Sequence, residues 1–372
     1  MAVSIFGVPW GELTLDDVTA FLREADDEPL LWEAKGTALD KREICRQVCG
    51  FANSHEGGYL ILGADRVTAA GADARTWTVE GVPFRDEPRT WISNVIGNLE
   101  RGVRPMPDFD VASWPTARGH VAVVRVAPTP TPPCITNGTL YERIPGKTIT
   151  VRDPLRLADL YARGDRARTD AQARADRAAA TLHSSQARLG DAIEFTVAVA
   201  ATGNSHDIAA KLFRQEFADA LWDRLDQRPQ GLPVPFRQPP DAVVWSQHAL
   251  SCSHQTRGPA SALTIARASW DGGVALHQQL DTHDARVESL VSSCVEPAWR
   301  MADELLRELG AFGDVYVSVL FSGGPFSPAA PPQEDLTIEL RRGPLLPGVD
   351  PLHVATVTRE LQRALQIPAP EP

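Results

Sequence analysis

Residues 28–65 read EPLLWEAKGTALDKREICRQVCGFANSHEGGYLILGAD, and this stretch decides the fold of the first part of the chain. Apolar and polar side chains alternate over residues 30–35. An extended chain therefore places Trp32 on an apolar face and Glu33 and Lys35 together on the opposite face. The alternation predicts a strand that packs on one side and presents an acidic–basic pair on the other.

Glu28 lies five residues before Glu33, an odd offset that sends it to the opposite face of a regular strand. Pro29 favours extended or turn geometry at Glu28 and removes one backbone donor. A bend at this proline would bring Glu28 round to Glu33. The alternative is a solvated loop, because Glu28 ends the acidic run Asp26-Asp27-Glu28.

A helix is predicted to follow this strand. Asp40 suits the N-cap position, and Glu43 stands at the third helical position, as in a capping box. Apolar residues then recur at helical spacing and define a buried stripe, namely Ile44, Val48, Phe51 and Ala52. The helix is predicted to end at Asn53 and Ser54.

A tight reversal and a second strand come next. Gly57 and Gly58 supply the backbone freedom for the reversal. The apolar run from Tyr59 to Leu62 is bounded by glycine and predicts a short buried strand. Asp65 is expected at the exit of that strand, where sheets commonly display functional groups.

These pieces together resemble the Schlafen-type AlbA domain. The family fingerprint is a Glu-x-Lys strand, a helix ending in an Ala-Phe-Ala-Asn-like sequence, a Gly-Gly pair and an apolar strand leading to Gly-Val-Asp. The corresponding pieces here are Glu33-Ala34-Lys35, Gly50-Phe51-Ala52-Asn53, Gly57-Gly58 and Gly63-Ala64-Asp65. Less specific similarity continues through Thr90–Pro107, His120–Val126 and Thr139–Arg143, so the resemblance covers residues 10–163.

The resemblance implies a metal-dependent activity. Some Schlafen proteins are endoribonucleases, hydrolases that cleave transfer and ribosomal RNA with three acidic residues around a cation. Carried over by motif, these acids are Glu28, Glu33 and Asp65. Such carboxylates suit Mg²⁺ or Mn²⁺, and Lys35 would add to the stabilisation of charge on the scissile phosphate. Where family members often carry a second acid, this chain has Arg66, which would either contact phosphate or neutralise Asp65.

The same resemblance also supports an alternative, a noncatalytic nucleic-acid-binding regulator. The candidate contacts with nucleic acid are Arg66, Tyr141, Arg143 and Lys147, the last three beyond an Asn137-Gly138 hairpin turn. For Arg143 a structural hydrogen bond is an equal alternative. RNA is the preferred partner over DNA, because recognition by shape and backbone needs few base contacts. A nucleotide-binding module is a weaker interpretation, since the sequence has no Gly-x-x-x-x-Gly-Lys loop.

The length of 372 residues favours two domains. We expect an α+β protein with a Schlafen-like AlbA domain of mixed sheet and helices over residues 1–164 and a mixed α/β domain over residues 190–372. Residues 165–189 are rich in Ala and Arg and predict a solvated connecting helix. The second domain would select a substrate, form a homodimer or bind another protein.

Periodicity outlines the elements of the second domain. Asp271-Gly272-Gly273 predicts a hairpin turn. The long helix expected next contains Pro297, which should kink or split it. The expected strands are 193–200, 263–270, 274–280, 315–321 and 336–340, and the expected helices are 208–225, 287–309 and 352–365.

Composition sets outer limits on function. The net charge of −11 argues against broad nonspecific affinity for nucleic acid, which usually needs a basic surface. No apolar run is long enough for a membrane span, and the N-terminus lacks a signal-peptide pattern, so no membrane partner is expected. Five cysteines, an odd number, suit a reducing compartment, and a cytoplasmic protein is predicted.

Overall fold

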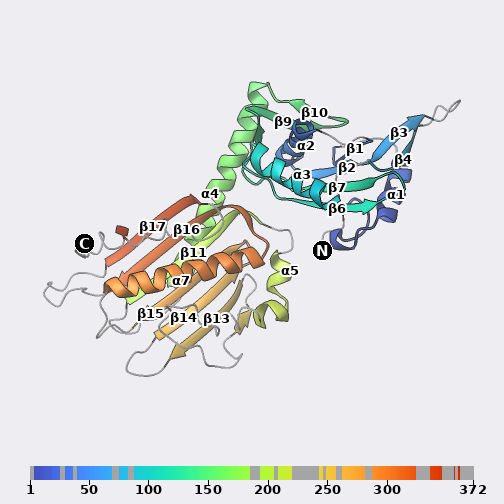
Figure 1. The fold of residues 1–372 in the computed structure, drawn as a ribbon. Helices are drawn as coiled ribbons and strands as arrows, with labels where there is room; N and C mark the ends of the chain where they lie inside the picture. Colours follow the sequence, from blue (N-terminus) through green and yellow to red (C-terminus); the bar gives the residue numbers. More distant parts are fainter. Residues whose placement is uncertain are drawn as a thin grey trace. The chain divides into compact units, whose positions relative to one another are not determined.

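The computed structural model divides the chain into two compact units, residues 1–166 and 167–372, shown in Figure 1. Both units combine helices with mixed or antiparallel sheets, as the predicted α+β class requires. The structure describes residues 4–25, 30–36, 40–68, 75–82, 88–184, 193–204, 208–219, 243–245, 249–256, 262–280, 287–323, 336–345, 356, 359 and 360.

The first unit is built on a four-stranded sheet. In order across the sheet, its strands are β1 (Trp32–Lys35), β2 (Gly58–Leu62), β7 (His120–Val126) and β6 (Phe109–Pro115). β1 pairs parallel with β2, and the other pairs are antiparallel. A parallel pair needs a crossover connection, and helix α2 (Lys41–Asn53) provides it. The predicted strand, capped helix and second strand are therefore all present.

Both faces of this sheet are buried, and the alternation of side chains along β2 shows why. Leu60 and Leu62 belong to one core with α2 and with Leu99 of α3 (Pro88–Gly102). Ile61, between them, belongs to a second core with Val18 of α1 (Leu15–Glu24). A strand buried on both faces has a continuous apolar sequence, as Tyr59–Leu62 does.

Smaller elements complete the first unit. Thr14 and Asp17 form a capping box at the start of α1, and Asp40 caps α2 by accepting from the Glu43 N–H at 2.8 Å. Asn137 and Gly138 both have positive φ and make the predicted hairpin turn. The remaining elements are η1 (Trp10–Glu12), β3 (Ala64–Thr68), β4 (Arg75–Val79), β5 (Val103–Arg104), β8 (Ile135–Thr136), β9 (Thr139–Ile144) and β10 (Lys147–Thr150).

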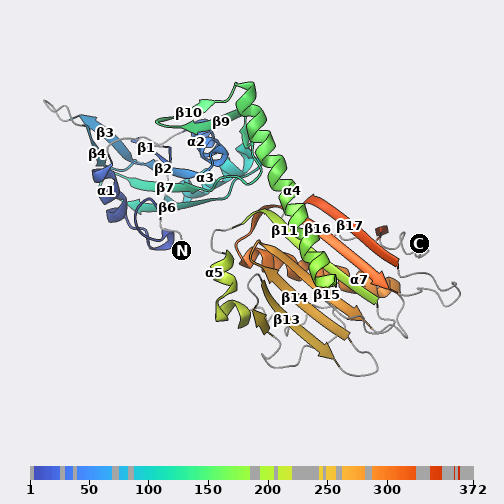
Figure 2. The ribbon, with the colours of Figure 1, turned by 180° about the vertical axis from the view of Figure 1, so that it is seen from behind.

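The second unit contains a seven-stranded antiparallel sheet in the order β12-β13-β14-β15-β11-β16-β17. Helix α7 (Val287–Glu308) packs its apolar stripe on one face, and the C-terminal part of α4 (Pro154–Ser184) lies on the other, as Figure 2 shows. The strands are β11 (Ile193–Gly203), β12 (Val243–Trp245), β13 (Ala249–Thr256), β14 (Ala262–Ser269), β15 (Gly273–Leu280), β16 (Phe312–Gly323) and β17 (Leu336–Leu345).

Three predicted helices differ in detail from the structure. α4 begins at Pro154 rather than at residue 165 and is not fully solvated, because Ala175, Ala179 and Leu182 are buried. α7 runs through Pro297 as one helix. The helix expected over 208–225 is interrupted: α5 (Ile208–Leu212) is followed, after a break at 213–214, by a helical segment over 215–219. Residues 220–225, like most of 352–365, lie outside the described part of the chain.

Candidate functional site

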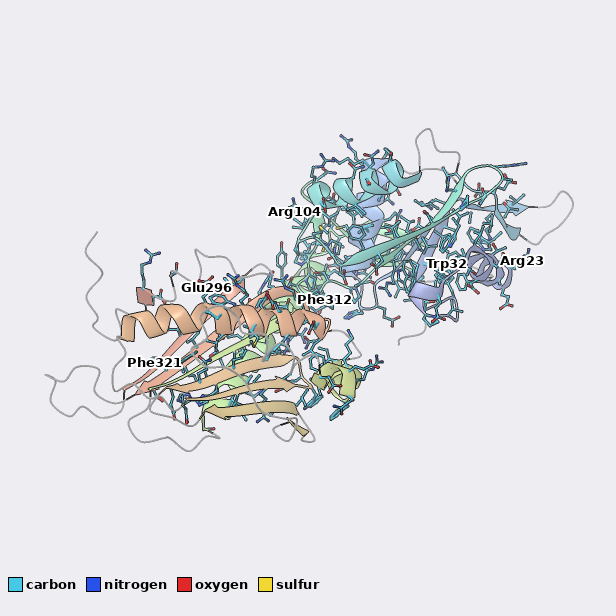
Figure 3. The ribbon with its side chains drawn as sticks, turned by 60° about the horizontal axis from the view of Figure 1, so that its bottom comes forward. Arg23, Trp32, Arg104, Glu296, Phe312 and Phe321 are labelled. Atoms are coloured by element: carbon cyan, nitrogen blue, oxygen red, sulfur yellow. The ribbon has the colours of Figure 1, made fainter. Side chains whose placement is uncertain are left out.

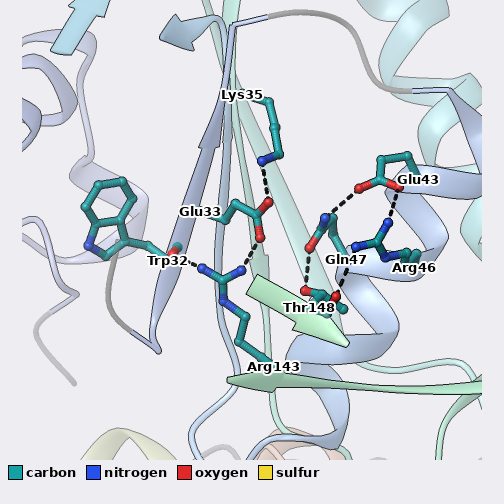
Figure 4. Close-up of polar contacts among 8 residues, drawn as sticks. All are labelled: Trp32, Glu33, Lys35, Glu43, Arg46, Gln47, Arg143 and Thr148. Carbon is teal, nitrogen blue, oxygen red and sulfur yellow. Dashed lines mark hydrogen bonds and ion pairs between the residues drawn. The ribbon is translucent and has the colours of Figure 1, made fainter. Parts of the chain in front are cut away.

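Glu33 is the centre of the predicted site in the first unit. It is only 3% exposed, and each carboxylate oxygen faces a different cation, as Figure 4 shows. Oε1 lies 2.5 Å from the Lys35 Nζ, and Oε2 accepts from the Arg143 Nη1. The Lys35 side chain keeps 35% of its surface exposed. Glu33 thus holds the partly exposed Lys35 and a buried cation, Arg143, together at the end of β1.

Arg143 makes structural hydrogen bonds, the equal alternative to a phosphate contact. Its side chain is fully buried, and its Nη2 donates to the Trp32 carbonyl at 2.8 Å. The guanidinium also lies over the Phe51 ring, 5.3 Å from the centroid. Trp32 itself is buried in the core of the unit, and Figure 3 labels its position. Arg143 is therefore an internal partner of Glu33, because a buried charge must be paired and hydrogen-bonded.

The charges in this cluster do not cancel. Glu33 carries one negative charge, while Lys35 and Arg143 carry two positive charges between them. One positive charge is left over, and Lys35 is the member that reaches solvent. An anion beside Lys35 would neutralise the excess.

A second polar network joins α2 to the hairpin of β9 and β10. Thr148 donates to the Gln47 Oε1 at 2.5 Å, and the Gln47 Nε2 donates to the Glu43 Oε1 at 2.6 Å. Arg46 donates to the Glu43 Oε2 at 3.0 Å and to the Thr148 carbonyl at 2.9 Å. The Arg46 guanidinium lies 6.0 Å from the Tyr141 ring centroid. The hairpin is thus fixed against α2 by several hydrogen bonds (Figure 4).

One cross-strand pair links the two networks. Thr148 of β10 pairs in register with Arg143 of β9. Thr148 contacts α2, and Arg143 contacts β1. Gly50 of α2 makes the close approach feasible, since a Cβ there would lie 2.6 Å from the Thr148 Cγ2. A residue without a side chain is needed at this crossing.

Asp65 follows β2, as predicted, and is the second residue of β3. It is exposed, and its Oδ1 accepts from the Arg66 N–H at 2.8 Å. Its carboxyl group packs on Gly36, where a Cβ would lie 2.6 Å from the Asp65 Oδ2. Asp65 is therefore brought to the end of β1, one residue beyond Lys35.

The predicted metal ligands are only partly described. Glu28 lies outside the described residues, so its approach to Glu33 stays a prediction. Within the portion of the chain that the structure covers, no three His, Cys, Asp or Glu side chains gather as a metal site. Carboxylate oxygens are suitable ligands for Mg²⁺ or Mn²⁺. The positive excess around Glu33 means, however, that a divalent cation would need both Asp65 and Glu28.

The other expected contacts are spread over the first unit. Arg66 is half-buried, and its guanidinium lies 5.7 Å from the Trp77 ring centroid. Tyr141 is half-buried and packs against the α2 core. Lys147 is exposed at the start of β10, where it pairs in register with Ile144. Of these three, Lys147 offers the most accessible charge.

Sequence reasoning did not predict the roles of Arg46, Gln47 and Thr148. Their only sequence signal is helical spacing: Glu43, Arg46 and Gln47 stand three and four positions apart on α2. The hydrogen bonds to Thr148 span more than 100 residues, which helical spacing cannot reveal.

The buried cysteines of the first unit are structural. Burial raises the pKa of the Cys49 and Cys134 thiols to about 12, and burial also raises the pKa of the Cys45 thiol. The Cys49 Sγ donates to the Cys134 carbonyl at 3.0 Å, and Asn53 exchanges hydrogen bonds with the Cys134 backbone. These thiols stay protonated at neutral pH and are unsuited to nucleophilic or metal chemistry.

Comparison with known proteins places the first unit in a family. Residues 28–152 match the family model described as Schlafen, AlbA_2. The first unit is a Schlafen-type AlbA domain. This match agrees with the resemblance seen in the sequence and includes every residue of the Glu33 cluster.

Solved structures add distant similarities. One is the N-terminal domain of a protein related to the ATP-dependent DNA helicase RecG from Nitrosomonas europaea, 20% identical, with a TM-score of 0.28 over 37% of this chain and 91% of that one. Another is the DIP2311 protein from Corynebacterium diphtheriae, 14% identical, with a TM-score of 0.26 over 57% of this chain and 37% of that one. No curated protein matches the chain. None of the helices described is long and apolar enough to cross a membrane.

Proposed function

We propose that the first unit binds nucleic acid through the phosphate backbone and that Lys35 is its central contact. The observation that carries this proposal is the partly exposed Lys35 ammonium, which Glu33 holds in place while the buried Arg143 supplies the second countercharge of Glu33. The Schlafen-type AlbA match supports a nucleic-acid partner.

The arrangement suits a phosphate for physical reasons. Arg143 is buried and fixes Glu33, and Glu33 in turn holds the Lys35 ammonium in place, so little side-chain entropy is lost when an anion binds. Lys147, exposed on the hairpin that carries Arg143, is the second proposed contact. Because the whole chain has a net charge of −11, binding is local to this site and weakens with salt.

Binding is tested on the full-length protein with fluorescently labelled transfer RNA and a DNA duplex of matched length. Lys35→Gln should weaken binding and lower the slope of log K against log salt concentration by about one. Arg23→Gln removes an exposed charge from α1 and should change neither quantity. Unchanged affinity and slope in Lys35→Gln would overturn the proposal. Tighter binding of transfer RNA than of the duplex identifies RNA as the partner.

A second candidate function is a divalent-metal-dependent endoribonuclease that cleaves structured RNA such as transfer RNA. The position of Asp65 favours it, because Gly36 leaves room for the Asp65 carboxylate beside the end of β1. Glu28, Glu33 and Asp65 would hold Mg²⁺ or Mn²⁺, which supplies charge stabilisation at the scissile phosphate. With all three acids, the net charge of the cluster becomes −1, which suits a cation. Lys35 would contact the phosphate from the other side.

The nuclease candidate is tested by incubating transfer RNA with the protein and Mn²⁺. Wild type and Asp16→Asn, an exposed control on α1, should cleave, whereas Asp65→Asn and Glu33→Gln should not. Asp65→Asn is the more informative variant, because Asp65 is exposed and its loss spares the buried ion pair. Equal cleavage by all variants, or none by wild type, would discard the nuclease and leave the binding role intact.

A further inference from the structure

The second unit buries a row of polar side chains on the sheet face that α4 covers. In the strand register, Thr196 of β11 faces His277 of β15, while Glu194 of β11 faces Gln279 on one side and Ser322 on the other. His277 and Thr196 are 0% exposed. Buried polar groups persist only when they are hydrogen-bonded. These residues lie far from the Glu33 cluster in sequence and belong to the other unit.

His183, in the last turn of α4, connects these side chains. Its Nδ1 lies 3.1 Å from the Thr196 Oγ1, which in turn lies 2.8 Å from the His277 Nδ1. Its Nε2 lies 3.0 Å from the Ser322 Oγ, which lies 3.3 Å from the Glu194 Oε2. Five side chains from α4 and three strands therefore form one continuous chain of hydrogen bonds.

The positions of the hydrogen atoms follow from the number available. Ser322 has one hydrogen and donates it to Glu194, so it accepts from the His183 Nε2–H. Neutral His183 then has a bare Nδ1, which accepts from the single Thr196 hydrogen. Thr196 consequently accepts from the His277 Nδ1–H. The His277 Nε2 is then a bare acceptor, and this buried atom has no hydrogen-bond partner in the structure.

We propose that this chain is a proton-responsive latch that holds the last turn of α4 on the sheet. When His183 takes up a proton from water at Nδ1, the Thr196 hydroxyl must turn round and donate to His277. His277 then releases its Nδ1 proton to water and takes up a proton from water at Nε2, so its own charge does not change. The net uptake is one proton, which resides on His183.

Protonation of His183 strengthens the latch because an acidic group faces the ring. Glu194 is the acidic group on β11, with its Oε2 4.0 Å from the His183 Nε2, and its other oxygen accepts from Gln279 at 2.6 Å. His277 on β15 is the second titratable group, with the two ring centroids 5.7 Å apart. Burial lowers the pKa of His277 to about 3, so it stays neutral while His183 titrates. The neighbour on β16, Ser322, is uncharged, so a charged His183 gains an ion pair with Glu194.

The latch is tested by NMR of the full-length protein with isotope-labelled histidine rings, whose nitrogen shifts report the tautomer. From about pH 8 to about pH 5.5, a range that spans the ordinary histidine pKa, His183 should gain charge while His277 moves its hydrogen from Nδ1 to Nε2 with the same midpoint. Thr196→Val should abolish the His277 change, and Thr196→Ser should restore it. Ser184→Ala, an exposed neighbour in α4, should leave both unaltered.

A second variant keeps the proposal testable if Thr196→Val fails to fold. Glu194→Gln should move the His183 midpoint to lower pH, because the facing negative charge is removed. The proposal is overturned if His277 keeps one tautomer while His183 titrates. It is equally overturned if Thr196→Val retains the coupling, or if Glu194→Gln leaves the His183 midpoint in place.

Discussion

At the scale of single residues, Glu33 is a buried charge on which the stability of the first unit depends. Its carboxylate is buried, and it pairs with Lys35 and Arg143. Glu33→Ala leaves the Arg143 charge buried without its partner and should lower the free energy of unfolding by about 3–5 kcal/mol. Lys35→Gln should cost about 0–1 kcal/mol, because that side chain is partly exposed. Guanidinium unfolding measures both, and equal losses would contradict a buried pair.

Gly36 gives a second prediction at this scale. Alanine there would put a Cβ 2.6 Å from the Asp65 carboxylate, so Asp65 must move away from the end of β1. Gly36→Ala should therefore reduce manganese-dependent cleavage as strongly as Asp65→Asn does, while leaving Lys35 and its binding role in place. Gly11→Ala is the matched control, because nothing lies within 4 Å of a Cβ at Gly11. Full cleavage by Gly36→Ala would show that the position of Asp65 is unimportant.

Alternation along the strand was enough to predict that Glu33 and Lys35 share a face. It could not predict that the shared face is internal, nor that Arg143 is the buried partner. Arg143 lies 110 residues further along, and its position depends on how the β9–β10 hairpin packs against α2. Local patterns report local geometry, whereas the partner of a buried charge is a tertiary property.

At the scale of elements, the crossing of α2 and the β9–β10 hairpin decides whether the two polar networks form. Gly50→Ala should destabilise the protein by about 1–3 kcal/mol, because the added Cβ would lie 2.6 Å from Thr148. That cost exceeds the gain of about 1 kcal/mol that alanine brings to a helix interior. Thermal unfolding followed by circular dichroism measures the change.

Gly97 in α3 is the matched control for this prediction. A Cβ there meets only the end of the Arg101 side chain, at 3.3 Å, and that flexible group can shift. Gly97→Ala should therefore be neutral or stabilising by up to about 1 kcal/mol. If both substitutions stabilise equally, the crossing at Gly50 is looser than the structure indicates.

Helix α2 was predictable because each of its signals is local: Asp40 caps it, and its apolar stripe has helical spacing. α4 was harder to interpret for the opposite reason. Its buried face consists mainly of alanines, Ala171, Ala175 and Ala179, which resemble a solvated helix in composition. Small side chains let a helix lie close to a sheet. That the alanines of α4 are buried in this way is seen only once the sheet they pack on is known.

At the scale of the whole molecule, the two units contrast in how polar groups are buried. The first unit buries an ion pair, whereas the second buries one neutral histidine, His277, beside Thr196. Polar alternation along β11 resembles the solvated face of an antiparallel strand. α4 covers that face instead, so residues that look exposed in sequence, such as Thr196, lie in the interior.

Burial of neutral His277 makes stability depend on pH. Its pKa is lowered from 6.5 to about 3 by desolvation first and by the nearby His183 second. Below about pH 6.5 the unfolded chain binds a proton at this position that the folded chain does not, so stability falls as pH drops towards 3. Guanidinium unfolding at a series of pH values should show this loss in wild type and a smaller loss in His277→Gln. His55→Gln removes an exposed histidine and should show the same pH dependence as wild type. If the free energy of unfolding depends on pH equally in all three proteins, folding does not lower the pKa of His277.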